Sequence, residues 1–308
     1  MLCPRQNRRA IFFWILLFVG FEAAVSVAET NELQHNAVIR TDSPDREVGP
    51  QNLAITTAGR RGSIVSVMDA SKAPMSIALV IDAGPNQSGI LNREKEIASS
   101  LISKFSDTRT EFIVVRAGYQ AATIANTSTG SVAVGSIQDI SPEPGQKSQI
   151  PVYKAVASAI EELSLRPGMR VLIIIAEGND SRSGISYKQL RASAQAQHVS
   201  VMTALVADHS TRGSKAILSY GWFLDSLAAD TAGIFIDNDR NTPRVVNRLE
   251  QAIRSLRLVT FEIDGVSLGR HKMRTSSSSV GRLHSQKDVF IEDPDCQQRC
   301  CLREKASA

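Results

Sequence analysis

The sequence predicts an α/β protein built on a doubly wound, mostly parallel six-stranded sheet with helices on both faces. Apolar segments of strand length alternate with segments whose apolar residues recur at helical spacing, which is typical of βαβ units. Residues 170–176 (RVLIIIA) form an unbroken apolar run. A run of this kind indicates a strand that is buried on both faces, at the centre of a parallel sheet.

The predicted elements follow one another in a regular order along the chain. The expected strands are residues 75–81, 111–116, 131–137, 170–176, 199–206 and 233–236. Residues 131–137 (SVAVGSI) alternate between polar and apolar positions, so they are expected at an edge of the sheet. The expected helices are residues 91–105, 152–165, 187–197, 220–229 and 244–258. Because βαβ crossovers are almost always right-handed, these helices should cover both faces.

Composition divides the chain into four segments. Residues 1–28 have the pattern of a signal peptide, and the polar residues 29–74 are expected to be an N-terminal arm or linker with a short strand at 63–68. Residues 75–258 hold the α/β domain. Residues 259–308 are expected to form one strand at 259–263, followed by a weakly ordered tail that contains cysteines.

The first segment indicates export. A basic start with Arg5, Arg8 and Arg9 precedes the apolar run 11–21, and small residues follow at 23–28. This is the pattern of a secretory signal peptide, and the apolar run is short for a membrane span. An uncleaved N-terminal anchor is the alternative. The expected location is therefore secreted, periplasmic or cell-envelope, with membrane contact only through this segment.

Net charge and cysteine content limit the classes of binding partner that the sequence predicts. The formal net charge of +4 includes three arginines of the signal segment, so the rest of the chain is only weakly basic and no nucleic-acid partner is expected. The cysteines outside that segment are Cys296, Cys300 and Cys301. An odd number in an exported chain leaves open one disulfide with a free thiol, or an intermolecular bridge.

Candidate ligand residues follow two strands that are expected to be neighbours. Asp82 ends the first strand, Asn86 lies in the loop after it, and Glu177 follows the central strand. Ligands of open α/β sheets bind beyond the carboxyl ends of the strands. Two carboxylates and one amide oxygen there make a site for a hard cation such as Mg²⁺ or another divalent ion.

The same loops carry a family resemblance. Between residues 63 and 275 the chain resembles a von Willebrand factor A-type domain, and more narrowly the exported A-domain-related proteins that are frequent in acidobacteria. Residues 82–86 (DAGPN) stand where the family has Asp-x-Ser-x-Ser, and residues 176–178 (AEG) stand where it has Ser-Asp-Gly. The segments 179–183 (NDSRS) and 269–272 (GRHK) also match.

The resemblance implies a metal-ion-dependent adhesion site that this chain has partly lost. In the family, oxygen ligands hold Mg²⁺ and leave one position for a carboxylate of the partner. Here Gly84 has no hydroxyl, and Ile150 stands where the family has threonine. The resemblance therefore implies a degenerate site, with Asp82, Asn86 and Glu177 as its remaining metal ligands.

The expected function is a non-enzymatic, exported protein-binding module for adhesion or scaffolding, whose loops at the carboxyl edge of the sheet contact another protein. One alternative is a metal-assisted hydrolase at the same edge. Another is a structural envelope component that is linked through its cysteines. The basic segment 59–62 (GRRG) is interpreted as part of a solvated arm. The oligomeric state is not predicted.

Overall fold

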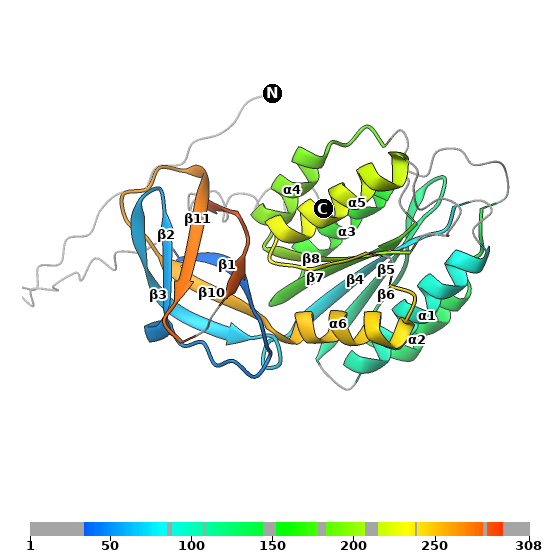
Figure 1. Ribbon diagram of the computed structural model, residues 1–308, viewed down its shortest axis with the longest axis horizontal. Coiled ribbons are helices and arrows are strands. Elements are labelled where there is room, and N and C mark those ends of the chain that lie inside the picture. Colours follow the sequence, from blue (N-terminus) through cyan, green and yellow to red (C-terminus); the bar gives the residue numbers. More distant parts are fainter. Residues whose placement is uncertain are drawn as a thin grey trace, which may run out of the picture. The chain divides into compact units, whose positions relative to one another are not determined.

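The computed structural model describes residues 34–84, 88–106, 109–143, 152–177, 183–206, 215–237, 239–279 and 282–291 (Figure 1). The predicted α/β fold is confirmed, and these residues belong to one compact unit. They form a six-stranded and a seven-stranded sheet. Residues 1–28, for which a signal peptide is predicted, and the three tail cysteines lie outside the described residues.

The six-stranded sheet is mostly parallel. Its strands are β4 (Met75–Asp82), β5 (Thr110–Ala117), β6 (Ala121–Thr127), β7 (Met169–Ala176), β8 (Val199–Leu205) and β9 (Phe235–Asp237). They lie in the order β6-β5-β4-β7-β8-β9, and only β6 runs antiparallel to its neighbour. In chain order this is third, second, first, fourth, fifth, sixth, which is the order of doubly wound sheets. The chain therefore changes direction across the sheet between β4 and β7.

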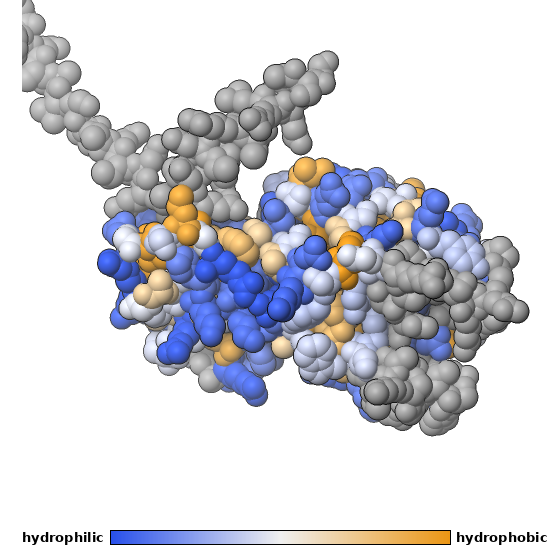
Figure 2. All heavy atoms as spheres, turned by 90° about the horizontal axis from the view of Figure 1, so that it is seen from above, coloured by the Kyte–Doolittle hydropathy of each residue, from blue (hydrophilic) through white to orange (hydrophobic). Residues whose placement is uncertain are grey.

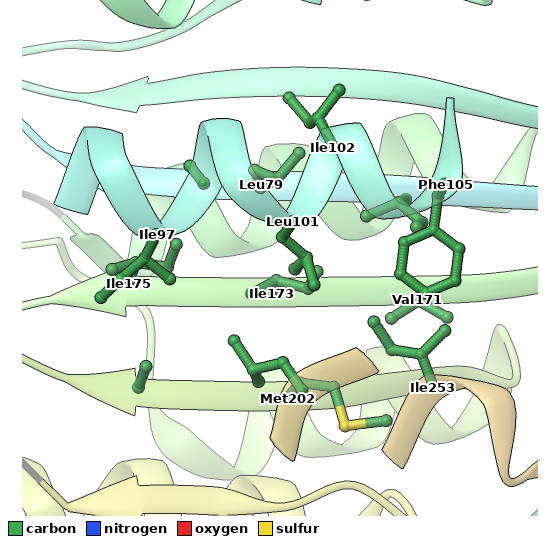
Figure 3. Packing of buried hydrophobic residues seen from close by; sticks show 14 of the residues in the cluster. Leu79, Ile97, Leu101, Ile102, Phe105, Val171, Ile173, Ile175, Met202 and Ile253 are labelled. Atoms are coloured by element: carbon green, nitrogen blue, oxygen red, sulfur yellow. The ribbon is translucent and has the colours of Figure 1, made fainter. Parts of the chain in front are cut away.

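Helices cover both faces of this sheet (Figure 1). The helices α1 (Ser88–Phe105), α2 (Gly130–Gln138) and α6 (Thr242–Arg254) pack on one face, and α3 (Val152–Ser164), α4 (Tyr187–Ala196) and α5 (Lys215–Asp230) pack on the other. Strand β7 contributes to both cores, with Ile173 on the first face and Ile174 on the second. Figure 3 shows Leu101 of α1 over Ile173. The central position expected for residues 170–176 follows from this burial on both sides.

The structure corrects one predicted strand. Residues 131–137 are not an edge strand, because they lie within helix α2. The apparent alternation came from Val132 and Val134, but the buried residues are Gly130, Ala133 and Ile137. Their spacing is helical, and they pack on α1. The edge strand next to β5 is instead β6, which was not predicted.

The seven-stranded sheet is antiparallel and corrects the expected arm and tail. Its order is β12-β1-β10-β3-β2-β11-β13. Before β4 come β1 (Gln34–Thr41), the 3-10 turn η1 (Pro50–Asn52), β2 (Leu53–Thr57) and β3 (Arg60–Asp69). After α6 come β10 (Leu256–Glu262), β11 (Gly269–Ser277), β12 (Leu283–Ser285) and β13 (Asp288–Ile291). Residues 34–69 are therefore not a linker, and the described residues 259–279 and 282–291 are not a weakly ordered tail.

This second sheet has a hydrophobic core of its own, which includes Ile39, Ile55, Phe261, Met273 and Val289. It joins segments that are far apart in the sequence, because β1 pairs with β10 from Gln34↔Glu262 to Arg40↔Leu256. No helix among the described residues has the length and apolar character that crossing a membrane requires.

Helix α4 begins with a capping box, which supports a first prediction. The Ser186 hydroxyl accepts a hydrogen bond from the Gln189 N–H at 3.3 Å, and the Gln189 side chain accepts one from the Ser186 N–H at 2.8 Å. We expect Ser186→Ala to lower the free energy of unfolding by about 1 kcal/mol, because an N–H of the first turn loses its acceptor. Urea denaturation measures the change. Ser193→Ala, at an exposed position of the same helix, is the control, and an equal loss there would contradict the role of the cap.

Candidate functional site

The candidate site lies where the order of the parallel strands reverses. Strand β4 ends at Asp82 and β7 ends at Ala176, and the two strands pair in parallel up to Ile81↔Ile175. Asp82 and Glu177 therefore lie at the same edge, as the strand-end rule predicts. The Asp82 side chain is fully buried, and its Oδ1 accepts a hydrogen bond from the Gly84 N–H at 3.0 Å. One oxygen of Asp82 thus holds the turn that leaves β4.

A third carboxyl group, Glu94 of α1, joins this pair. It is fully buried, and neither of its carboxylate oxygens has a hydrogen-bond partner of normal geometry in the described part of the chain. Burial first, and then the charges of Asp82 and Glu177, raise the pKa of the Glu94 carboxyl well above its usual range. The Asp82 backbone and the positive charge of Arg93 lower this pKa, but by less than burial and the two carboxylates raise it. Glu94 therefore favours its neutral, protonated form.

The chain after β5 borders the same edge. The Ala83 N–H donates to the Ala117 carbonyl at 2.9 Å, and the Glu143 N–H donates to the Ala83 carbonyl at 2.9 Å. The Glu143 carboxylate lies 3.3 Å from the Arg116 guanidinium. Tyr119, two residues beyond β5, is 42% exposed. Backbone hydrogen bonds thus fix a loop surface around Asp82, and an aromatic side chain is open to solvent on it.

The predicted ligand set is only partly within the described residues. Asp82 and Glu177 lie close enough for both charges to act on Glu94. Asn86 and Ile150 lie outside the described residues. Among the residues that are described, no three histidine, cysteine, aspartate or glutamate side chains are grouped so that they could hold a metal ion. With one Asp82 oxygen bonded to Gly84, the described residues alone supply too few oxygen ligands to fit Mg²⁺.

Sequence reasoning missed Glu94, although the sequence holds a signal for it. In α1 the buried positions include Leu91, Glu94, Ile97, Ala98 and Leu101, which follow helical spacing. Glu94 is the charged residue within this apolar stripe. A carboxyl group on the core-facing side of a helix is costly unless it is paired or neutralised, and that cost marks it as a candidate site residue.

Comparisons with solved structures give weak similarities. An aerotolerance-related membrane protein from Bacteroides fragilis is 18% identical, with a TM-score of 0.45 over 58% of this chain and 97% of that chain. BatB from Bacteroides thetaiotaomicron is 17% identical, with a TM-score of 0.47 over 59% of this chain and 98% of that chain. A von Willebrand factor type A protein from Catenulispora acidiphila is 10% identical, with a TM-score of 0.45 over 87% of this chain and 76% of that chain. No protein-family model and no curated protein matches the sequence.

Proposed function

We propose that this chain is an exported, non-enzymatic protein-binding module of the von Willebrand factor A type, and that its contact surface is the carboxyl edge of the six-stranded sheet. The observation that carries the proposal is the reversal of strand order between β4 and β7, with Asp82 and Glu177 at that point. Open α/β sheets bind ligands at this position. Loops that a rigid sheet holds in place are the usual carriers of binding function.

The character of the edge favours a protein partner. Tyr119 is exposed two residues beyond β5, whose last residue Ala117 pairs with Asp82, and tyrosine is among the residues that contribute most to protein interfaces. Export is proposed from the sequence of residues 1–28. The expected location is accordingly the cell envelope or the extracellular space.

Site-specific photo-crosslinking in the cells that produce the protein tests this proposal. A photoreactive amino acid at position 119 is expected to give a discrete protein adduct, because this side chain lies at the proposed contact edge. The control is position 165, where Leu165 is 72% exposed and follows the end of α3 at the opposite edge of the sheet. Adducts at position 165 and none at position 119 would refute the choice of edge.

Metal dependence is a separate hypothesis, in which Asp82, Asn86 and Glu177 are the ligands of Mg²⁺ or another divalent cation. Its test is a calorimetric titration of the chain with Mg²⁺, Mn²⁺ and Ca²⁺, repeated with Asp82→Ala. Micromolar to low-millimolar binding that Asp82→Ala abolishes would support the hypothesis, because the number of oxygen ligands sets the affinity. An absence of heat with both proteins would leave partner binding at this edge independent of metal.

A further inference from the structure

Two basic segments of the sequence, 59–62 and 269–272, come together in the antiparallel sheet. In that sheet β2 lies between β3 and β11, and Thr56 of β2 pairs with Arg61 on one side and with Arg274 on the other. Residues that pair across strands direct their side chains to the same face. Lys272 lies two residues before Arg274, so it shares that face. We call Arg61, Lys272 and Arg274 the basic strip.

The basic strip lies on the outer face of the sheet. All three side chains are exposed, whereas Met273, between Lys272 and Arg274, is buried in the core on the other face. From strand geometry, Lys272 and Arg274 are about 7 Å apart along β11, and Arg61 is about 10 Å from Arg274 across β2. Figure 2 shows hydrophilic side chains gathered over the part of the surface that the antiparallel sheet forms.

One carboxylate lies next to the strip, because Asp288 pairs with Lys272 across strands, but its ion pairs are with Arg270 and Arg191. Arg61, Lys272 and Arg274 form no ion pair with any residue that the structure describes. Arg270, next along β11 on the same face, differs because its guanidinium lies 3.0 Å from the Asp288 carboxylate. The three like charges are not directly opposite one another, because Thr56 separates Arg61 from Arg274 and Lys272 lies two residues from Arg274. Since none of the three forms an ion pair with a described residue, an external anion could contact all of them without breaking one.

The side chains around the strip indicate the kind of anion. Thr56, Ser63 and Ser276 lie on the same face and place small hydroxyl groups beside the three cations, and the carboxylates of Glu262, opposite Ser63, and Asp288, opposite Lys272, border them. Hydroxyl groups donate to and accept from carboxylate, sulfate and sugar oxygens. The exposed large aromatics of the described residues, Tyr119 and Trp222, lie outside this sheet. Contact with an anion here would depend on charge and hydrogen bonds, because no large aromatic side chain of the described part of this sheet is exposed to stack on bases. Val65, Met68 and Leu268 are exposed on or beside the sheet, so a lipid surface is the assignment that the vesicle measurement below tests.

From these observations we infer that the basic strip binds a linear acidic polysaccharide, laid along β11 so that successive carboxylates or sulfates meet Arg274 and Lys272 while Arg61 contacts the chain from the side. This surface lies on the antiparallel sheet, so the inference is independent of the protein-binding edge proposed above. An exported protein with both surfaces would bind a protein partner at one and an envelope or extracellular polymer at the other.

The test is the affinity of the full chain for heparin fragments and for polygalacturonate, which are linear sulfated and carboxylated polysaccharides, in about 50 mM salt. The triple variant Arg61→Gln, Lys272→Gln, Arg274→Gln is expected to weaken binding at least about tenfold, because three direct charge contacts are lost. Raising the salt to about 200 mM is expected to weaken binding of the unchanged chain, and to do so less for the variant.

A charge-matched control separates the strip from net charge. Arg109→Gln, Arg240→Gln, Arg248→Gln removes the same charge at exposed positions outside the antiparallel sheet, and we expect it to change the affinity less than about threefold. Equal weakening by both triple variants would overturn the inference, since binding would then follow net charge alone. Binding to phosphatidylglycerol vesicles without binding to either polysaccharide would also overturn it, and would assign the strip to a lipid surface. Circular dichroism establishes that each variant is folded.

Discussion

Asp230→Ala is expected to lower the free energy of unfolding by about 3–5 kcal/mol, the range found when one partner of a buried ion pair is removed. Asp230 ends helix α5, and its carboxylate accepts a hydrogen bond from the Tyr187 hydroxyl at 2.8 Å. The same carboxylate lies 3.1 Å from the Arg191 guanidinium. The Asp230 side chain is 12% exposed and that of Arg191 is 17% exposed, so water screens this pair only weakly.

The carboxylate of Asp230 has one more cationic neighbour, which adds little to the expected loss. Its carboxylate also lies 3.4 Å from the Lys287 ammonium, and its backbone carbonyl accepts from the Lys287 N–H at 3.0 Å. Residue 287 lies between β12 and β13 of the antiparallel sheet, whereas α5 packs on the six-stranded sheet. Lys287 is 58% exposed and contributes little by charge alone. The effect of Asp230→Ala therefore comes mainly from Arg191 and Tyr187, which lose a shared acceptor.

Urea denaturation followed by circular dichroism measures this prediction. Asp225→Ala is the matched control, because Asp225 is exposed on the same helix and forms no ion pair with any described residue. The control is expected to change the free energy of unfolding by less than about 0.5 kcal/mol. If both variants lost the same small amount, the contacts of Asp230 would add nothing measurable to stability.

The accuracy of sequence reasoning differed between the two sheets for a physical reason. Strands β4, β7 and β8 are nearly continuous apolar runs, and such runs indicate strands buried on both faces without knowledge of their neighbours. Strand β1 (QHNAVIRT) has polar ends and buries only part of its residues. It becomes a strand by pairing with β10, which follows more than 200 residues later. A local pattern carries no information about that partner, so residues 34–69 resembled a linker.

The candidate site was also predictable only as far as local strand patterns allow. Asp82 and Glu177 followed from the rule that parallel strands end at one edge. Glu94 lies on the helix after β4, and its closeness to Asp82 depends on how α1 packs on the sheet. The basic strip required the register as well, because Arg61 and Arg274 are brought together only by their shared partner Thr56. Composition alone predicted a solvated arm for segment 59–62. The strand register instead places this segment in the surface of the antiparallel sheet.

Glu94→Gln is expected to raise the free energy of unfolding by about 2 kcal/mol or more at pH 8, because glutamine keeps the shape of the side chain and removes its charge. Burial and the charges of Asp82 and Glu177 raise the pKa of Glu94 in the folded chain above the value of about 4.5 that applies when it is unfolded. The folded state therefore holds the proton more tightly. The stabilising contribution of protonated Glu94 is complete below about pH 4.5 and is lost as the pH rises through the folded-state pKa.

Urea denaturation of both proteins at several pH values between 4.5 and 8 measures the prediction, and the advantage of Glu94→Gln should grow as the pH rises. Glu96→Gln is the control on the same helix, because Glu96 is exposed and its substitution should change the free energy of unfolding only slightly. If the stability advantage of Glu94→Gln grows with pH, the unchanged chain holds a proton on Glu94, next to the carboxylates of Asp82 and Glu177. A partner that brings positive charge to this edge would then favour the release of that proton. A difference independent of pH would mean that Glu94 is already charged in the folded chain, so that the edge presents three negative charges to its partner instead of two.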